Sequence, residues 1–167
     1  MSRSFAALMT EFEAVLKDGK ITAAYQGLAA YIRDLRAHFA ASYPEYDFPG
    51  NIYYGYLDMT YFSILPPALK KRDLKVAVVF NYQSFRFEAW LSGRNRKAQE
   101  TAFHAIKGAG WETYRLTPNP EKSDSVLEHI LAPDPEFSDL DELTKQIERG
   151  TLDFIQKLED FDADQPA

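Results

Sequence analysis

Two β-rich runs that almost touch in the sequence constrain the fold of this chain more than any other feature. They are LKVAVVFNYQ (residues 74–83) and FRFEAWLS (residues 85–92). A link this short favours an antiparallel hairpin, although it lacks the Asn-Gly pair of the tightest turns. Because successive side chains of a strand point to opposite faces, one face of the second run is apolar and is predicted to be core. The other face carries Arg86, Glu88 and Trp90.

Four segments have apolar residues at helical spacing and predict the helices. Residues 4–17 and 21–42 are expected to form an opening helical hairpin, with Ser4 as the N-cap of its first helix. A third helix is expected over residues 95–107, where the glycines of GAG mark its end. The last helix is expected over residues 140–161.

Aromatic and β-branched runs predict the remaining strands. NIYYGYLDMTYFSIL (residues 51–65) predicts one or two strands, and its alternation places Tyr54, Tyr56 and Asp58 on one face. WETYRLTP predicts another strand, and SVLEHILA (residues 125–132) predicts an edge strand. The sequence between these two runs has the composition of a loop.

Together these elements predict an α+β fold. It comprises an N-terminal helical hairpin, a mainly antiparallel sheet of about four to six strands, one inserted helix, and a C-terminal helix packed on the sheet. At 167 residues the chain has the length of one domain, and no linker separates two cores. Residues 1–167 are therefore predicted to form a single α+β domain.

Composition and charge exclude several classes of function. The chain has no cysteine, which rules out disulfides, thiolate metal sites and cysteine nucleophiles. A formal net charge of −6 disfavours a large nucleic-acid footprint. Glu11 and Glu13 interrupt the apolar run that a signal peptide would need, and no uncharged apolar run is long enough to span a bilayer. We expect a soluble cytoplasmic protein without a membrane partner.

The corner at Ser92 and Gly93, where the central hairpin is expected to turn into a helix, allows two interpretations. If a helix begins near Asn95, its first backbone N–H groups and its positive dipole end could hold a phosphate or a carboxylate. Arg94 and Arg96 would flank such an anion site. In the structural interpretation, Ser92 or Asn95 caps the helix, and the arginines pair with nearby carboxylates.

The run FNYQSFRFEAWLSGRNRKAQ (residues 80–99) resembles the most recognisable segment of an uncharacterised, mostly bacterial family of small soluble proteins, with a phrase close to F-E-x-W-L-x-G-R-N-R. MTYFSILPPALKKRDLKVAVVF (residues 59–80) is similar to the same family, and the likeness covers residues 50–110 most clearly. The family is a domain of unknown function. The resemblance therefore implies a fold unit, without an activity and without catalytic residues.

The sequence neither requires nor excludes an enzyme, and it favours a protein without catalytic activity. No nucleotide-binding or nucleophile-elbow motif occurs, and the three histidines lie on separate predicted elements. We therefore predict no cofactor and no metal site, and assign no catalytic residue. Asp58 and Glu88 could be the carboxylates of a restriction-type nuclease, but Trp90 stands where such a site needs a lysine.

Three hypotheses for the function follow from these observations. The first is a non-catalytic binding or adaptor module that holds a small anionic ligand or an acidic peptide. The second is a metal-dependent nuclease-like or other hydrolytic enzyme that uses Asp58 and Glu88. The third is a homo-oligomeric interaction protein, most simply a homodimer, that uses an amphipathic helix. The candidate ligand-binding residues are Tyr54, Tyr56, Asp58, Arg86, Glu88, Trp90, Arg94 and Arg96.

Overall fold

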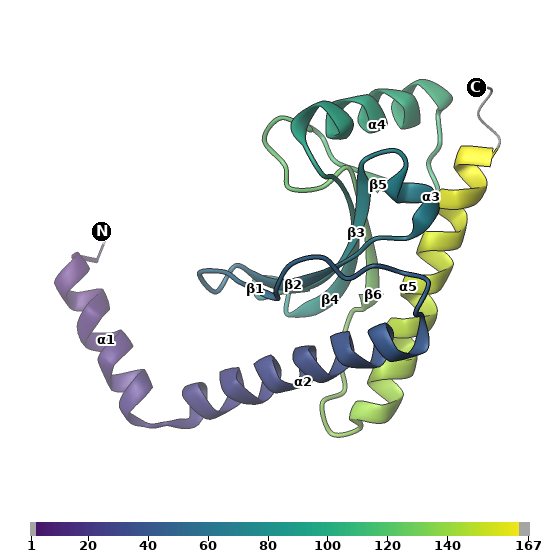
Figure 1. Ribbon diagram of the computed structural model, residues 1–167. Helices are drawn as coiled ribbons and strands as arrows, with labels where there is room; N and C mark the ends of the chain where they lie inside the picture. Colours follow the sequence, from purple (N-terminus) through teal and green to yellow (C-terminus); the bar gives the residue numbers. More distant parts are fainter. Residues whose placement is uncertain (1–2, 164–167) are drawn as a thin grey trace. The chain divides into compact units, whose positions relative to one another are not determined.

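The computed structural model describes residues 3–163, whose elements are shown in Figure 1. The chain divides into two compact units, Met1–Ala37 and His38–Ala167. The predicted α+β class is confirmed, with two N-terminal helices, an antiparallel sheet of six strands and a C-terminal helix. None of the helices in the described part combines the length and the apolarity needed to cross a membrane. A single domain over residues 1–167 stays a prediction.

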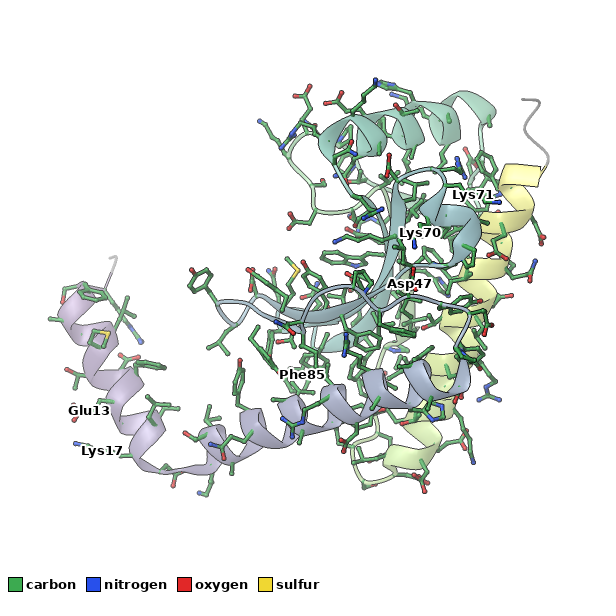
Figure 2. The ribbon with its side chains drawn as sticks, viewed as in Figure 1. Glu13, Lys17, Asp47, Lys70, Lys71 and Phe85 are labelled. Carbon is green, nitrogen blue, oxygen red and sulfur yellow. The ribbon has the colours of Figure 1, made fainter. Side chains whose placement is uncertain are left out.

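The first unit is helical. Helix α1 (Phe5–Lys17) begins at the predicted N-cap, because the side chain of Ser4 accepts a hydrogen bond from the N–H of Ala7. Helix α2 (Lys20–Ser42) follows after a turn and runs past the boundary into the second unit. An i,i+4 ion pair of 2.6 Å between Glu13 and Lys17 supports the last turn of α1 (Figure 2). No residue of α1 is buried, although the sequence pattern gives it a full apolar stripe.

The second unit contains a six-stranded, wholly antiparallel sheet in the order β1-β2-β3-β4-β6-β5. Its elements include the one-turn helix α3, the inserted helix α4 and the C-terminal helix α5. The bounds are β1 Tyr53–Tyr54, β2 Met59–Ile64, α3 Pro67–Lys70, β3 Leu74–Asn81, β4 Arg86–Gly93, α4 Arg96–Ala109, β5 Arg115–Leu116, β6 Leu127–Ala132 and α5 Leu140–Ala163.

The predicted central hairpin is confirmed as strands β3 and β4. They pair over their whole length, from Leu74 opposite Gly93 to Asn81 opposite Arg86. Phe85 takes up a left-handed backbone conformation in the turn that joins them, with φ +53°, and its ring has an edge contact with the ring of Phe80, at 5.2 Å between centroids. Four residues, 82–85, form this turn where the sequence suggested about two, and the side chain of Asn81, the last residue of β3, accepts hydrogen bonds from the N–H groups of Gln83 and Ser84.

One face of the sheet forms the core of the second unit. Alternate residues of β3 and β4 on this face are almost fully buried, and α5 lies along them (Figure 1). His129 of β6 stacks on Phe154 of α5, with 6.1 Å between the ring centroids. Phe62 of β2 packs against Phe39, at 5.9 Å. The core side chains contributed by the central hairpin are Val76, Val78, Phe80, Phe87, Ala89 and Leu91.

Three details of the strand prediction are wrong. Residues 51–65 do not alternate without interruption, because Leu57 has φ +62° and turns the chain back between β1 and β2. The segment around β6 is not an edge strand, since β6 pairs with β4 on one side and with β5 on the other. The strand expected in WETYRLTP shrinks to the two residues of β5, which form the sheet edge.

Candidate functional site

A cavity of about 540 Å³ opens on the face of the sheet opposite the core. Its floor comes from strands β2, β3 and β4, and its walls come from the β1–β2 hairpin, the start of α4 and the loop before β6. The cavity has the volume of a small-molecule site. It is lined by Tyr53, Asp58, Met59, Tyr61, Lys75, Ala77, Trp90, Ser92, Gly93, Asn95, Arg96, Gln99, Pro120, Ser123 and Asp124.

Strand register explains how these side chains come together. Lys75 lies opposite Ser92, and Ala77 lies opposite Trp90, so both pairs share the cavity face. On the other side of the floor, Tyr61 is paired with Tyr53 across β1 and β2. The two tyrosine rings stack with 5.1 Å between their centroids. The floor is therefore partly aromatic, and a lysine stands within it.

Lys75 is the charged side chain that β3 contributes to the floor. It is partly buried and lies over the ring of Tyr61, with 5.9 Å from Nζ to the ring centroid. Among the residues that the structure describes, it makes no ion pair and no hydrogen bond through its ammonium group. Burial, and secondly the neighbouring cation Arg94, lower the pKa of Lys75 below the usual lysine value. Its ammonium group is therefore partly desolvated without a compensating anion.

Two carboxylates line the same cavity. The Oδ1 of Asp58 accepts a hydrogen bond of 2.8 Å from the N–H of Met59 in the β1–β2 hairpin. Asp124 lies at the end of the loop before β6, and its carboxylate is near Tyr61. Burial raises the pKa of Tyr61, and the neighbouring Tyr53 and Asp124 raise it further. The cavity thus presents charges of both signs around one tyrosine ring.

The wall formed by residues 118–124 is a loop, as predicted, and several side-chain hydrogen bonds to its backbone carbonyls hold it in place. The Nε2 of Gln99 on α4 donates to the carbonyl of Ser123 at 2.7 Å and to that of Pro120 at 3.2 Å. The Oγ of Ser92 donates to the carbonyl of Asp124 at 2.7 Å. Arg96 donates to the carbonyl of Glu121, also at 2.7 Å. Side chains of β4 and α4 therefore hold this wall in place.

The strand-to-helix corner agrees with the structural interpretation in its cap and only in part in its arginines, since Arg94 lies 3.7 Å from the carboxylate of Asp73 whereas Arg96 donates to a backbone carbonyl. Asn95 is the N-cap of α4, because its Oδ1 accepts from the N–H of Ala98 at 2.8 Å. The N–H of Gly93 donates to the side chain of Gln99, and the N–H of Arg94 donates to the carbonyl of Asp73. A Cβ on Gly93 would lie 2.4 Å from the backbone N of Gln99, which explains the glycine. Two backbone N–H groups of the corner, which could otherwise bind an anion, therefore already have partners within the protein.

Glu88 supports the indole of Trp90 from the adjacent part of β4. It is only 2% exposed, and its carboxylate accepts hydrogen bonds of 2.7 Å from Nε of Arg86 and from Nε1 of Trp90. The hydroxyl of Ser84 donates to it at 3.4 Å. The carboxylate charge is therefore compensated inside the protein, and the orientation of the Trp90 ring is fixed.

The structure separates the candidate binding residues into three groups. Asp58, Trp90 and Arg96 line the cavity. Arg86 and Glu88 line a second cavity of about 340 Å³ beside β6 instead. The remaining three candidates, Tyr54, Tyr56 and Arg94, line neither of these two cavities. Tyr54 lies on β1, and Tyr56 is 95% exposed in the turn between β1 and β2. The guanidinium of Arg94 lies 3.7 Å from a carboxylate oxygen of Asp73.

Sequence reasoning missed several lining residues that tertiary structure brings together. Lys75 could have been found from the hairpin register, because an antiparallel pairing of the two runs places it beside Ser92. Strand alternation puts Tyr53 and Tyr61 on the face opposite Tyr54, but only the turn at Leu57 shows that these two rings stack across two strands. No pattern in the sequence marked Gln99 or Asp124.

The structure offers no metal centre among the described residues, since no three His, Asp or Glu side chains gather in a suitable cluster. Asp58 and Glu88, the two carboxylates of the nuclease hypothesis, line different cavities. His38 lies 3.1 Å from a Glu148 carboxylate oxygen, His104 has an edge contact with Phe103, and His129 stacks in the core. Each histidine thus has a contact within the protein.

The fold and the cavity define an antiparallel α+β domain with a polar, partly aromatic pocket on the solvent side of its sheet. The family model described as "Domain of unknown function (DUF7000)" matches residues 5–162, so the chain belongs to this family. Comparison with curated proteins and with solved structures gives no match. The family match covers nearly the whole chain, whereas the phrase at residues 87–96 and the bacterial occurrence stay predictions.

Proposed function

We propose that this protein is a non-catalytic binding module that holds a small anionic ligand in the cavity over β2, β3 and β4. The observation that carries the proposal is Lys75, a partly buried cation in the cavity lining without an ion-pair partner among the described residues. Taking an ammonium group out of water costs free energy unless an anion compensates it. A bound phosphate or carboxylate would supply that anion.

The rest of the cavity is suited to such a ligand. Arg96 lies at the wall, where one Nη donates to the loop and the guanidinium keeps other donors for a ligand. The rings of Tyr53, Tyr61 and Trp90 offer flat apolar surface, which suits a planar or aliphatic part of a ligand. The wall residues are held by hydrogen bonds within the protein, so binding would require little ordering of the loop.

The hydrolytic alternative has weaker support. It requires the carboxylates of Asp58 and Glu88 to act on one substrate, yet they line separate cavities. Glu88 also has Arg86 and Trp90 as hydrogen-bond partners, an arrangement suited to a positioning role. A binding role without catalysis explains the positions of Asp58 and Glu88 and requires neither a metal ion nor a shared substrate.

A thermal-shift screen against phosphates, nucleotides and carboxylates tests this proposal. A ligand at a hundredfold excess over its Kd should stabilise the wild type by about 2.7 kcal/mol. We expect the shift to be lost in Lys75→Met and reduced in Arg96→Ala. The matched control is Lys97→Met, which removes an exposed cation of the same corner that does not line the cavity. If no anion shifts the wild type, or if the control loses as much as the test variants, the proposal is wrong.

A second candidate function rests on α1. Six apolar side chains of this helix are at least partly exposed, including Phe5 at 77%, and no residue of α1 is buried. An isolated helix of this length is only marginally stable in water. Self-association through this face would cover it, in keeping with the homodimer hypothesis. Sedimentation of the wild type and of Phe12→Glu tests this. A wild type that is still monomeric at a protein concentration of about 100 μM, where even a weak dimer with a Kd of that order would be populated, would contradict it.

A further inference from the structure

We infer that the ligand of this cavity is a zwitterion that carries a protonated amine as well as an acidic group, of the amino-acid or short-peptide type. This inference rests on the proposed function and names the class of ligand more narrowly. The observation behind it is that Lys75 and two carboxylates, Asp58 and Asp124, line one cavity without forming an ion pair with one another.

The ring of Tyr61 shows how the charges are arranged. Lys75 lies over this ring, with Nζ 5.9 Å from its centroid. The carboxylate of Asp124 acts on the hydroxyl of the same tyrosine, whose pKa is raised by burial first, then by Tyr53, and then by Asp124. A cation and an anion are therefore both near one side chain in the lining. Neither has a salt-bridge partner among residues 3–161.

Strand pairing and hydrogen bonds hold the backbone that carries each of these two groups. Lys75 projects from β3, where it pairs in register with Ser92. The backbone of Asp124 is tied to the same Ser92, whose hydroxyl donates to its carbonyl. Gln99 holds the preceding residue, Ser123, against α4. The backbone that carries each side chain is therefore held in place, and a ligand in this cavity would meet both charges.

Charge complementarity then selects the ligand. The lining carries two cations, Lys75 and Arg96, and two carboxylates, Asp58 and Asp124. A purely anionic molecule would use only the cations and would leave both carboxylates facing it without a cationic partner, which opposes its binding. A molecule with an acidic group toward Lys75 and an amine toward the aspartates satisfies both sides by charge-assisted hydrogen bonds. The volume of about 540 Å³ leaves room for an apolar side chain between the acid and amine groups and the aromatic walls.

The experiment is a thermal-shift titration of the full chain with defined probes. These are the twenty common amino acids and the dipeptides Gly-Tyr, Gly-Leu and Gly-Glu, each also as its N-acetyl and its C-terminal amide form. We expect at least one free zwitterion to bind, and expect each of its two blocked forms to bind at least about tenfold more weakly, since each loses a charge-assisted contact.

Variants assign the two ends of the ligand. In Asp124→Asn the free and N-acetyl forms should bind about equally, because the partner of the amine is gone. In Lys75→Met the free and amide forms should bind about equally, because the partner of the acid is gone. Glu121→Gln is the matched control, since Glu121 is an exposed carboxylate of the same loop outside the cavity lining. It should keep both preferences.

The outcomes separate this inference from the proposed function. If inorganic phosphate, simple carboxylates or N-acetyl forms shift the wild type as strongly as any free zwitterion, the inference is wrong and the anion-binding function stands. If a zwitterion binds but Asp124→Asn and Asp58→Asn both keep the amine preference, the inference is likewise wrong. If neither a zwitterion nor an anion produces a shift, both proposals are wrong.

Discussion

The two faces of the β3–β4 hairpin show how one pair of strands can serve both stability and binding. On the core face, Val76, Val78 and Phe80 lie opposite Leu91, Ala89 and Phe87, and all six are nearly inaccessible to water. On the other face, the same strands carry the cavity residues Lys75, Ala77, Trp90 and Ser92. In the half of the hairpin that reaches the cavity, residues that pack in the core thus alternate with residues that line the cavity.

Glu148 near the core and Lys75 in the cavity differ in whether they have a hydrogen-bond or ion-pair partner within the protein. Near the core side, Glu148 of α5 accepts a hydrogen bond of 2.6 Å from Tyr43 and lies 3.1 Å from His38. In the cavity, the ammonium group of Lys75 lies over the ring of Tyr61 and has no ion-pair partner among the described residues. Polar groups that support the fold are paired within the protein, whereas the cavity keeps a charge that a ligand can use.

The largest expected effect is the loss of a core side chain. Phe80 has an exposed fraction of 0% and contacts Phe87 at 5.0 Å between ring centroids. Phe80→Ala should lower the free energy of unfolding by about 3–5 kcal/mol, because it removes buried area and leaves a cavity. Urea denaturation measures this. A loss below about 1 kcal/mol would mean that this face is not the core.

Gly93→Ala tests the corner at which the hairpin meets α4. The new Cβ would lie 2.4 Å from the N of Gln99 and 2.7 Å from the carbonyl of Asn95, so the backbone must shift. We expect a loss of about 1–3 kcal/mol.

Gly108→Ala in the same helix is the control, because nothing lies within 4 Å of its added Cβ. It should be neutral or should stabilise the protein by up to about 1 kcal/mol, since alanine is the better helix former. Equal losses in the two variants, measured by denaturation, would show that crowding at the corner is not the cause.

The paired carboxylate near the core predicts a pH dependence. Burial of Glu148 opposes ionisation, but hydrogen bonds from Tyr43 and His38 outweigh it and lower the pKa below 4.5. Its stabilising contribution should therefore be present above pH 4.5 and be lost as the pH falls through the lowered pKa.

Unfolding free energies of the wild type and of Glu148→Gln between pH 7 and about pH 3 should differ most at the upper end and converge at the lower end. The difference isolates Glu148 from the other carboxylates that titrate in the same range. A gap that stays constant with pH would contradict this assignment.

The smallest expected effect has the opposite sign. Because burial lowers the pKa of Lys75, the protonated amine disfavours the folded state at neutral pH. Lys75→Met should raise the melting temperature of the unliganded protein by about 1–2 °C, the shift that roughly 0.5 kcal/mol gives in a chain of this length. Lys97→Met, which removes an exposed cation, should change it less. A lower melting temperature for Lys75→Met would show that this lysine supports the fold.

The sequence by itself determined the local elements. The apolar periodicity located the main helices, Ser4 and the GAG segment marked the expected ends of helices, and alternation separated the two faces of β4. These features depend on neighbouring residues, so they can be recognised in a short window. The sequence also separated Trp90 from the core face, and Trp90 lines the cavity.

Tertiary structure decided the contents of the pocket. Tyr61, Lys75, Gln99 and Asp124 come from segments that are far apart in the sequence, and only strand pairing and the pinned loop bring them together. The left-handed backbone at Leu57 determined which tyrosines face the cavity, a choice that strand alternation predicted wrongly. Faces can be predicted from local periodicity, but a site depends on register and long-range hydrogen bonds, and a shift of one residue reverses its composition.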